Sequence, residues 1–548
     1  MTWPKPLLFV AAVVVVLALG FVVKRLWDPN LHSWQKAVVV LGFAAGAAFA
    51  VSVMVVVWNR PDYCHYGLRL EVKAGQCVGV SDGSYTFDRA QNPAMDKVTQ
   101  LIGEENAAAE KSKSTVTVAF MLPMTSDNDS ERRQILREVQ GAYLAQRQAN
   151  QVGRLGERTP DIRLVLANPG QDYAAWETVT DRLRGMAGDS KYPLRAVVGF
   201  NLSVKNTEDA LHTLTAAGVP VVGGPLTADE MENVRKNGVQ RFPGMARTVP
   251  TNSAQASALV HFNKNTKPKD AALVVDIRAN DTYNASLAAA FSKAVSPRTK
   301  PKEFESKSPT DEGNVANQFG SMVDSICYSG AKDIYFAGRP AHLRLFLLEL
   351  ADRPCGKQAL RVITGSGAST VSLYLTGKDW DRLKGNEQLT LQYAAVGHPQ
   401  MWAKGDFGAA GKFYTDTQHS PASVMREAVK EAGELRARLG EPVRWEDSRA
   451  MSAFDSVWLA ANALKGLPPG PDDHVPSLED VRGQWRNTYA DKGVPGATGW
   501  LCLDNDGNPY NKAVAVVTLD QTDRSVCFEG MGWPKGAPSP NCDVPKEG

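Results

Sequence analysis

The sequence predicts an α/β protein with two doubly wound, Rossmann-like lobes, preceded by two transmembrane helices. Three observations predict this architecture. From residue 115 onward, short apolar runs typical of buried strands alternate with segments of helical periodicity. The alternation continues for roughly 400 residues, which is more than one domain of this class requires. Two long apolar runs precede it, and each has the length of a membrane span.

The strands and helices follow one another in a regular order. Strands are predicted at 116–122, 162–167, 196–199, 219–222, 272–276 and 333–336, and helices at 131–150, 173–186, 207–217, 283–295, 315–329 and 341–351. Such alternation places helices on both faces of a mainly parallel sheet. Near the C-terminus, 500–503 and 513–519 flank Asp-Asn-Asp-Gly-Asn, whose turn-forming residues predict a hairpin.

The two apolar runs are residues 7–23 and 37–58. A hydrocarbon core about 30 Å thick needs roughly 20 apolar helical residues, so the second run spans it and the first just reaches. The alternative for the first run is a secretory signal segment, but it has no small-residue cleavage site before Lys24. The loop between the runs carries Lys24, Arg25 and Lys36, which predicts a cytoplasmic loop and an extracellular C-terminal portion. We therefore expect a multi-pass protein of the cell membrane.

The cysteines support the same orientation. All seven follow the second apolar run, and their spacing suggests the disulfides Cys64–Cys77, Cys327–Cys355 and Cys502–Cys527. Cys542 is then either free or a competing partner. Disulfides persist in oxidising compartments, which favours a location outside the cell. The alternative is that these residues are unrelated buried thiols.

The same patterns predict the division of the chain. Residues 1–58 hold the membrane helices, and 59–113 form a juxtamembrane segment that ends in a polar spacer. Lobe 1 is expected at 114–248 plus 396–490 and lobe 2 at 249–395 plus 491–530, with a loose tail at 531–548. These boundaries follow from the changes in strand, helix and turn signals.

Charge and motifs exclude several classes of function. The 61 basic and 59 acidic residues leave a net charge of +2, so nucleic acid is not an expected partner. The sequence contains no phosphate-binding loop, zinc-protease motif or nucleophile elbow, so we expect no catalysis, cofactor or metal. Asp504 opens a segment similar to a calcium loop, but that segment has no closing Glu, and a hairpin turn is the preferred interpretation.

Several segments resemble one family, the type I periplasmic-binding-protein fold of branched-chain amino-acid receptors of ABC transporters. VTVAFMLPMT resembles the opening strand, and AVVGFNLSVKNTEDALHTLTAAGVPVVGGPLTADEM resembles the next units. FPGMARTVPTNSAQASALVHF resembles the first crossover between lobes. DIYFAGRPAHLRLFLLEL and AFDSVWLAANAL resemble later helices, and GATGWLCLDNDGNPYNKAVAVV resembles the closing hairpin. The resemblance covers about Val116 to Leu519 and implies two lobes that hinge shut on a solute.

The resemblance also implies a ligand site. Ser203 matches a hydroxyl donor after the third strand, Thr227 matches the Thr that binds an α-carboxylate, and Tyr283 matches the aromatic of the second lobe. Ser203 and Thr227 are alternatively plain helix caps, and Tyr283 is alternatively a core residue.

Two positions depart from the family pattern. Arg339 stands where members often have an aromatic, and Ser366 stands where amino-acid receptors often have the acid that pairs with the ammonium. Asp281 is a possible substitute for that acid. The identity of the ligand therefore stays open.

The sequence thus predicts a membrane-anchored, extracellular solute-binding protein for an amino-acid-like or other small polar molecule. Its expected partners are the solute, the lipid bilayer and an ABC permease. The alternative is a ligand sensor or interaction protein that signals through its transmembrane helices. The chain also lacks the lipid-attachment sequence of many such receptors, because Cys64 follows Trp-Asn-Arg-Pro-Asp-Tyr.

Overall fold

The computed structural model describes residues 24, 32–38, 41, 63–112, 114–151, 160–264, 271–295, 300–465, 467 and 475–545. The chain divides into two units, Met1–Cys64 and His65–Gly548. Except for Ala37, Val38 and Leu41, both predicted membrane spans lie outside the described residues. Within the described residues, no helix combines the length and apolar character needed to cross a bilayer.

In the second unit, lobe 1 is built on a mixed sheet. Its strands are β2 (Leu70–Lys73), β3 (Gln76–Ser81), β5 (Asp161–Asn168), β4 (Thr115–Met121), β6 (Leu194–Gly199), β7 (Val221–Gly223) and β10 (Met245–Arg247), given in their order across the sheet. The strands from β5 to β10 are parallel, whereas β2 and β3 run antiparallel at the edge. The short strands β8 (Arg235–Lys236) and β9 (Val239–Gln240) pair with each other, and β1 (Tyr63–His65) falls where the first unit of the chain ends and the second begins.

Helices cover both faces of the lobe 1 sheet. Alternate residues of β4 point to opposite faces, because side chains of a strand alternate: Val118 joins one core and Ala119 the other. The first face carries α3 (Pro93–Ala109), α4 (Asp129–Asn150), α15 (Pro421–Glu434) and α16 (Arg449–Lys465). The second carries α5 (Trp176–Met186) and α6 (Lys205–Ala216), while α17 (Leu478–Gly483) packs near β6.

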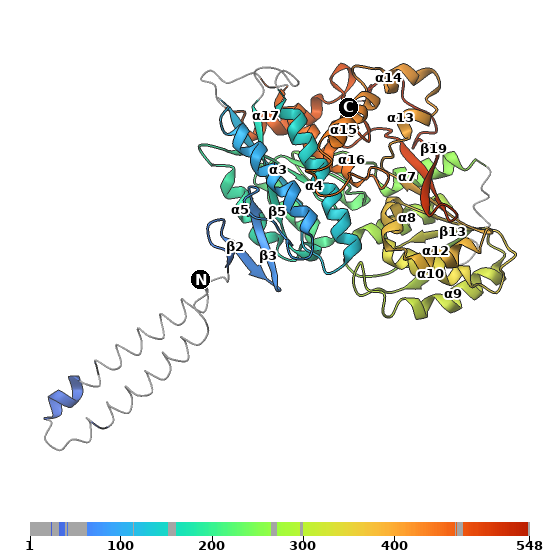
Figure 1. The fold of residues 1–548 in the computed structure, drawn as a ribbon, viewed down its shortest axis with the longest axis horizontal. Helices are drawn as coiled ribbons and strands as arrows, with labels where there is room; N and C mark the ends of the chain where they lie inside the picture. Colours follow the sequence, from blue (N-terminus) through green and yellow to red (C-terminus); the bar gives the residue numbers. More distant parts are fainter. Residues whose placement is uncertain are drawn as a thin grey trace. The chain divides into compact units, whose positions relative to one another are not determined.

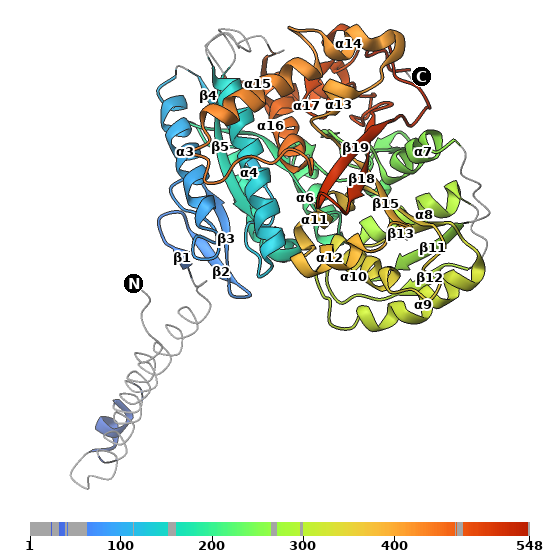
Figure 2. The ribbon, with the colours of Figure 1, turned by 45° about the vertical axis from the view of Figure 1, so that its right-hand side comes forward.

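Lobe 2 repeats this arrangement with a second sheet. Its strands, in spatial order, are β12 (Lys302–Phe304), β11 (Ala271–Asp276), β13 (Asp333–Ala337), β14 (Leu360–Thr364), β15 (Leu389–Ala395), β18 (Val514–Asp520) and β19 (Ser525–Gly532). The first five are parallel, and β18 and β19 add an antiparallel hairpin beside β15, drawn in red in Figure 2. One face carries α7 (Asn252–Phe262) and α8 (Thr282–Ala294), and the other carries α9 (Ala316–Ser329), α10 (Pro340–Ala351) and α12 (Gly377–Lys384). The expected pair of α/β lobes is therefore present, although both sheets are mixed.

Short elements connect the lobes. They are α13 (Met401–Lys404), α14 (Gly411–Thr415), β16 (Val494–Gly496) and β17 (Gly499–Leu501), whereas α11 (Val371–Tyr374) belongs to lobe 2. The crossover after β10 and the turn before β18 lie together, since Arg247 N donates to Gly507 O at 2.9 Å. The buried Asp455 carboxylate of α16 accepts from Ala497 N (2.5 Å) and Thr498 N (2.9 Å) in the β16–β17 turn. These bonds fix the connecting segments to lobe 1.

The predicted spacer at the end of 59–113 is instead part of lobe 1, and this prediction is corrected. Strand β3 pairs with β5 in the sheet, and α3 covers residues 93–109 (Figure 1). Met95, Val98 and Ile102 of α3 are buried in the core of lobe 1. Because polar residues separate these apolar positions, the sequence pattern did not predict a core helix. The buried side chains show that α3 is one. Likewise, residues 401–415, expected in lobe 1, contribute Met401 and Tyr414 to the core of lobe 2.

The cysteines partly follow the predicted pairing. The Cys327–Cys355 disulfide is present. The predicted Cys502–Cys527 pair is wrong, because Cys502 bonds to Cys542, and Cys527 is free and exposed. Cys64 and Cys77 are both disulfide-bonded. The part of the predicted loose tail around Cys542 is therefore fixed to the folded chain.

Close helix packing gives a first prediction. A Cβ atom added at Gly141 in α4 would lie 2.1 Å from the carbonyl oxygen of Ala450, at the contact between α4 and α16. Gly141→Ala should therefore push the helices apart and lower the free energy of unfolding by about 1–3 kcal/mol. The matched control is Gly185→Ala in α5, where an added Cβ meets nothing within 4 Å; it should stabilise by about 0.5–1 kcal/mol. Denaturant titration measures both, and equal effects would contradict the close packing.

The disulfides give a second prediction. Alkylation of the folded, unreduced protein followed by peptide mass spectrometry should label Cys527 and recover Cys502 linked to Cys542. Cys542→Ser should add Cys502 to the labelled residues. It should also lower the free energy of unfolding by about 3–4 kcal/mol, because the bond closes a 40-residue loop. Recovery of a Cys502–Cys527 peptide would contradict the structure.

Candidate functional site

The carboxyl ends of the parallel strands in both lobes open toward one region. In lobe 1, β6 ends at Gly199 and β7 ends at Gly223, and the loops that follow carry Ser203 and Thr227. In lobe 2, Tyr283 lies in the first turn of α8 after β11, Arg339 precedes α10 after β13, and Ser366 opens the 3-10 turn after β14. In open α/β sheets, ligands bind at this end of the strands.

These segments line a cavity between the two lobes. The residues that line it are Asn201, Ser203, Pro225, Thr227, Tyr283, Arg339, Ser366, Gly367, Ser369, Val396, Ser448 and Arg449. Small-molecule sites are typically about 300–1,000 Å³. The free space in this cavity is about 30 Å³, far below that range, so a bound solute requires the lobes to stand farther apart than they do here.

The structure brings the predicted site residues together. Ser203, Thr227, Tyr283, Arg339 and Ser366 all line the cavity. Asp281 does not line the cavity and instead pairs with Arg339.

Two of the lobe 1 residues are held through their backbones. Ser203 O accepts from Tyr283 N at 3.2 Å and from Arg339 Nη2 at 3.1 Å. Thr227 O accepts from Asn252 N at 2.7 Å, at the start of α7. Both residues are buried, and neither hydroxyl caps its neighbouring helix, since neither α6 nor the 3-10 turn Asp229–Met231 has a side-chain cap. Their hydroxyl groups are therefore positioned at the cavity wall.

Tyr283 and Ser366 form the opposite wall. The Tyr283 hydroxyl accepts a hydrogen bond from Gly367 N at 2.8 Å, which leaves its own proton for another acceptor. Burial raises the pKa of Tyr283 to about 12, so the phenol stays protonated at neutral pH. Ser366 N donates to Gln255 Oε1 at 3.0 Å, and this bond fixes the start of the loop after β14.

Arg339 is held by a buried ion pair. Its Nε and Nη2 atoms donate to the two carboxylate oxygens of Asp281 at 2.9 and 2.7 Å. The guanidinium also lies over the Tyr283 ring, 4.7 Å from its centroid. Burial alone would lower the pKa of Arg339, but the charge of Asp281 raises it above its ordinary value. Arg278 donates to the same Asp281, which is thus shared by two cations.

The sequence did not single out Arg449, which is the second cation at the cavity. Arg449 is the first residue of α16 and follows Ser448, whose φ is +64°. Its Nη1 lies 3.4 Å from Oε1 of Glu138, and Asn201 Nδ2 donates to the other oxygen of Glu138 at 2.8 Å. Burial raises the pKa of Glu138 to about 7, although Arg449 and the Asn201 hydrogen bond oppose this shift.

The other lining residues that sequence reasoning missed lie at strand ends or in turns. They are Asn201, Pro225, Gly367, Ser369, Val396 and Ser448. For Asn201 and Val396, which closely follow β6 and β15, the signal was available, because every residue just past a parallel strand is a candidate.

The two lobes are in contact on both sides of the cavity. Lys205 N donates to Asn280 O at 3.1 Å, and Asp229 accepts from Ser286 Oγ at 2.6 Å. On another side, Ser130 Oγ donates to Leu373 O at 2.7 Å. These bonds hold the two lobes together around the cavity, and a solute would fit between them only when the lobes separate.

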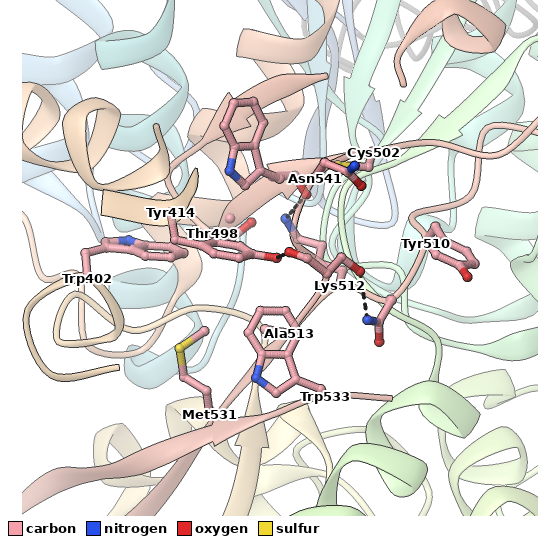
Figure 3. Close-up of a pocket in the computed structure, with 14 residues that line it drawn as sticks. Trp402, Tyr414, Thr498, Cys502, Tyr510, Lys512, Ala513, Met531, Trp533 and Asn541 are labelled. Atoms are coloured by element: carbon pink, nitrogen blue, oxygen red, sulfur yellow. Dashed lines mark hydrogen bonds between the residues drawn. The ribbon is translucent and has the colours of Figure 1, made fainter. Parts of the chain in front are cut away.

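A second cavity, with a free volume of about 20 Å³, lies beside the Cys502–Cys542 disulfide and is shown in Figure 3. Its lining includes Trp402, Tyr414, Trp533 and the buried Lys512. These polar groups bond to the protein itself: Tyr414 donates to Ser539 O at 3.0 Å, and Lys512 Nζ to Trp500 O at 3.3 Å (Figure 3). The arrangement is that of an internal packing region.

The turn that opens at Asp504 binds its own backbone. Asp504 Oδ1 accepts from Asp506 N at 2.9 Å and from Asn508 N at 2.8 Å. Within the described stretches of the chain, no group of three or more His, Cys, Asp or Glu residues is arranged to hold a metal ion. An isolated antiparallel bridge between Leu503 and Pro509 closes this turn. The predicted hairpin of 500–503 with 513–519 is wrong, because β17 pairs with β16, whereas β18 pairs with β15 and β19.

Comparisons with known proteins give structural matches but no sequence match. No protein-family model matches the sequence, and no curated protein sequence matches it. A leucine-binding protein, LivK, from Thermotoga maritima has 17% identity and a TM-score of 0.54, over 77% of this chain and 99% of that chain. LivJ of Streptococcus pneumoniae, a branched-chain amino-acid transporter substrate-binding protein in complex with isoleucine, has 16% identity and a TM-score of 0.52, over 77% and 99%.

A solute-binding protein of an ABC transporter from R. palustris, in complex with 4-hydroxybenzoate, is also similar. It has 13% identity and a TM-score of 0.51, over 77% of this chain and 97% of that chain. These structures are of solute-binding proteins rather than enzymes. At such low identities the similarity shows the fold: this chain has the two-lobed fold of the type I periplasmic-binding proteins, like the branched-chain amino-acid receptors of ABC transporters.

Proposed function

We propose that this chain is a solute-binding protein that closes its two lobes on a small polar molecule, without catalysis. The observation that carries this proposal is the cavity between the lobes, because residues of lobe 1 and of lobe 2 both line it. Ser203 and Thr227 supply hydroxyl groups from one side, and Tyr283 and Ser366 supply them from the other. A solute that bonded to both sides would stabilise the closed form over the open form.

The proposal includes a location outside the cell, with the chain anchored by two transmembrane helices at 7–23 and 37–58. The sequence pattern supports the helices, and the Cys327–Cys355 and Cys502–Cys542 disulfides support an oxidising compartment. The fold supports delivery of the solute to an ABC permease, since the compared structures with this fold are transporter-associated binding proteins.

Sensing is the second candidate function. The observation that favours it is the pair of predicted spans, since two helices offer a route for a closure signal that a lipid anchor does not. Genes for a permease and an ATPase beside this gene would favour transport, and a gene for a kinase or regulator would favour sensing.

Ligand binding is tested by thermal shift and calorimetry on the full-length chain in mild detergent, against a panel of amino acids, hydroxy acids and neutral polar solutes. A bound solute at 100 times its dissociation constant should stabilise the protein by about 2.7 kcal/mol. Thr227→Ala should weaken binding by roughly tenfold or more, because a hydrogen bond to a charged group contributes about 1.5–3 kcal/mol.

The matched control is Thr522→Ala, which changes an exposed threonine in the turn between β18 and β19. It should leave the dissociation constant unchanged. Equal affinity of the Thr227→Ala protein and the wild type for a confirmed solute would contradict the proposed site.

A further inference from the structure

The charges at the cavity indicate which class of solute it accepts, an inference that rests on the proposed function. Two guanidinium groups, those of Arg339 and Arg449, line the cavity, and none of its described lining residues is a carboxylate. The remaining polar groups of the lining are hydroxyls, an amide and backbone atoms. An isolated charge in an enclosed cavity is costly unless it is paired, so the sign of the lining charge selects the solute.

The acids nearest to the cavity are already occupied. Asp281 receives two hydrogen bonds from Arg339 and a third from Arg278. Glu138 is buried behind Asn201 and Arg449 and bonds to both. An ammonium group in the cavity would therefore approach two guanidiniums before it approached either acid.

Arg449 is only partly satisfied by Glu138. Its Nε atom is buried and has no hydrogen-bond partner among the described residues. Asp447, the other acid close to it, pairs with Arg137. A donor of this kind bonds strongly to a carboxylate, and charge-assisted bonds of guanidinium groups are among the strongest in proteins.

Asn201, by contrast, has an acceptor atom without a hydrogen-bond partner among the described residues. Its Nδ2 donates to Glu138, whereas its Oδ1 is buried and has no partner in the described chain. An acceptor oxygen requires a donor from the solute. A neutral hydroxyl group supplies one, whereas an ammonium would add a positive charge beside Arg449, and like charges repel.

We propose that the cavity selects a small carboxylic acid that carries a hydroxyl group and no ammonium group, with Arg449 as the residue that binds the anion and Asn201 as the acceptor for the hydroxyl. The helices α6, α8, α10 and α16 all begin at this region, and their N-termini add to the preference for an anion.

The test compares acids that differ in one group. Calorimetry on the full-length chain measures the dissociation constants of lactate and alanine, malate and aspartate, and 2-hydroxy-4-methylpentanoate and leucine. Within each pair the carbon skeleton is the same, and a hydroxyl replaces the ammonium. The decisive pair is the one that contains the tightest-binding acid of the panel. In that pair, the hydroxy acid should bind at least tenfold more tightly than the amino acid.

Three variants test the role of Arg449. Arg449→Gln should weaken binding of the hydroxy acid at least tenfold. The control Arg182→Gln changes an exposed arginine of α5 and should have no effect. If Arg449→Gln fails to fold because Glu138 loses its partner, the double variant Glu138→Gln/Arg449→Gln, which removes both charges, takes its place and should lose the preference for the hydroxy acid.

The outcomes separate this inference from the proposed function. If an amino acid binds as tightly as its hydroxy acid, or if the double variant keeps the preference, the inference is overturned while solute binding stands. If no solute of this panel or of the wider screen binds, the proposed function fails as well.

Discussion

The rest of the structure depends on one constraint. The carboxyl ends of the parallel strands of lobe 1 face the carboxyl ends of the parallel strands of lobe 2. In each lobe the parallel strands end in loops instead of hairpins, so polar side chains collect at one edge of each sheet. The crossovers after β10 and β15 turn these two edges toward each other. Ser203 from one lobe and Tyr283 from the other then meet at 3.2 Å through their backbones, and a cavity lined by both lobes follows.

The buried charges at this meeting point organise the site more than they stabilise the fold. Removing Arg339 and Asp281 from water is costly, and a buried ion pair recovers that cost only with good geometry. The bidentate contact and the stacking on Tyr283 provide this geometry. Arg339 of lobe 2 also donates a hydrogen bond to Ser203 O of lobe 1, and this bond helps to hold the lobes in the closed form.

The sequence predicted the two lobes because their signals are local. The strands of the first lobe and the helices between them have clear periodicity, and Ser203, Thr227, Tyr283, Arg339 and Ser366 all follow strands in the chain. Whether these residues bind a solute stays a prediction, but their meeting in one cavity could be anticipated from the rule that strand ends hold ligands.

Other features depend on contacts between distant segments, which periodicity does not reveal. The edge hairpin β2–β3 and helix α3 join lobe 1 through pairing with β5 and burial of Met95 and Val98. Cysteine spacing favoured the nearer Cys527, yet the fold of the C-terminal segment brings Cys542 to Cys502. Arg449 follows an irregular loop, and only the packing of α16 against α4 places it beside Glu138.

The central claim is that one solute site is formed by the strand ends of both lobes. The measurement that tests it most directly is a crystal structure of the chain with its tightest-binding solute. We expect electron density for the solute between Thr227 of lobe 1 and Tyr283 of lobe 2. Density for the solute elsewhere, for example among Trp402 and Trp533 in the second cavity, with the space between the lobes empty, would contradict it.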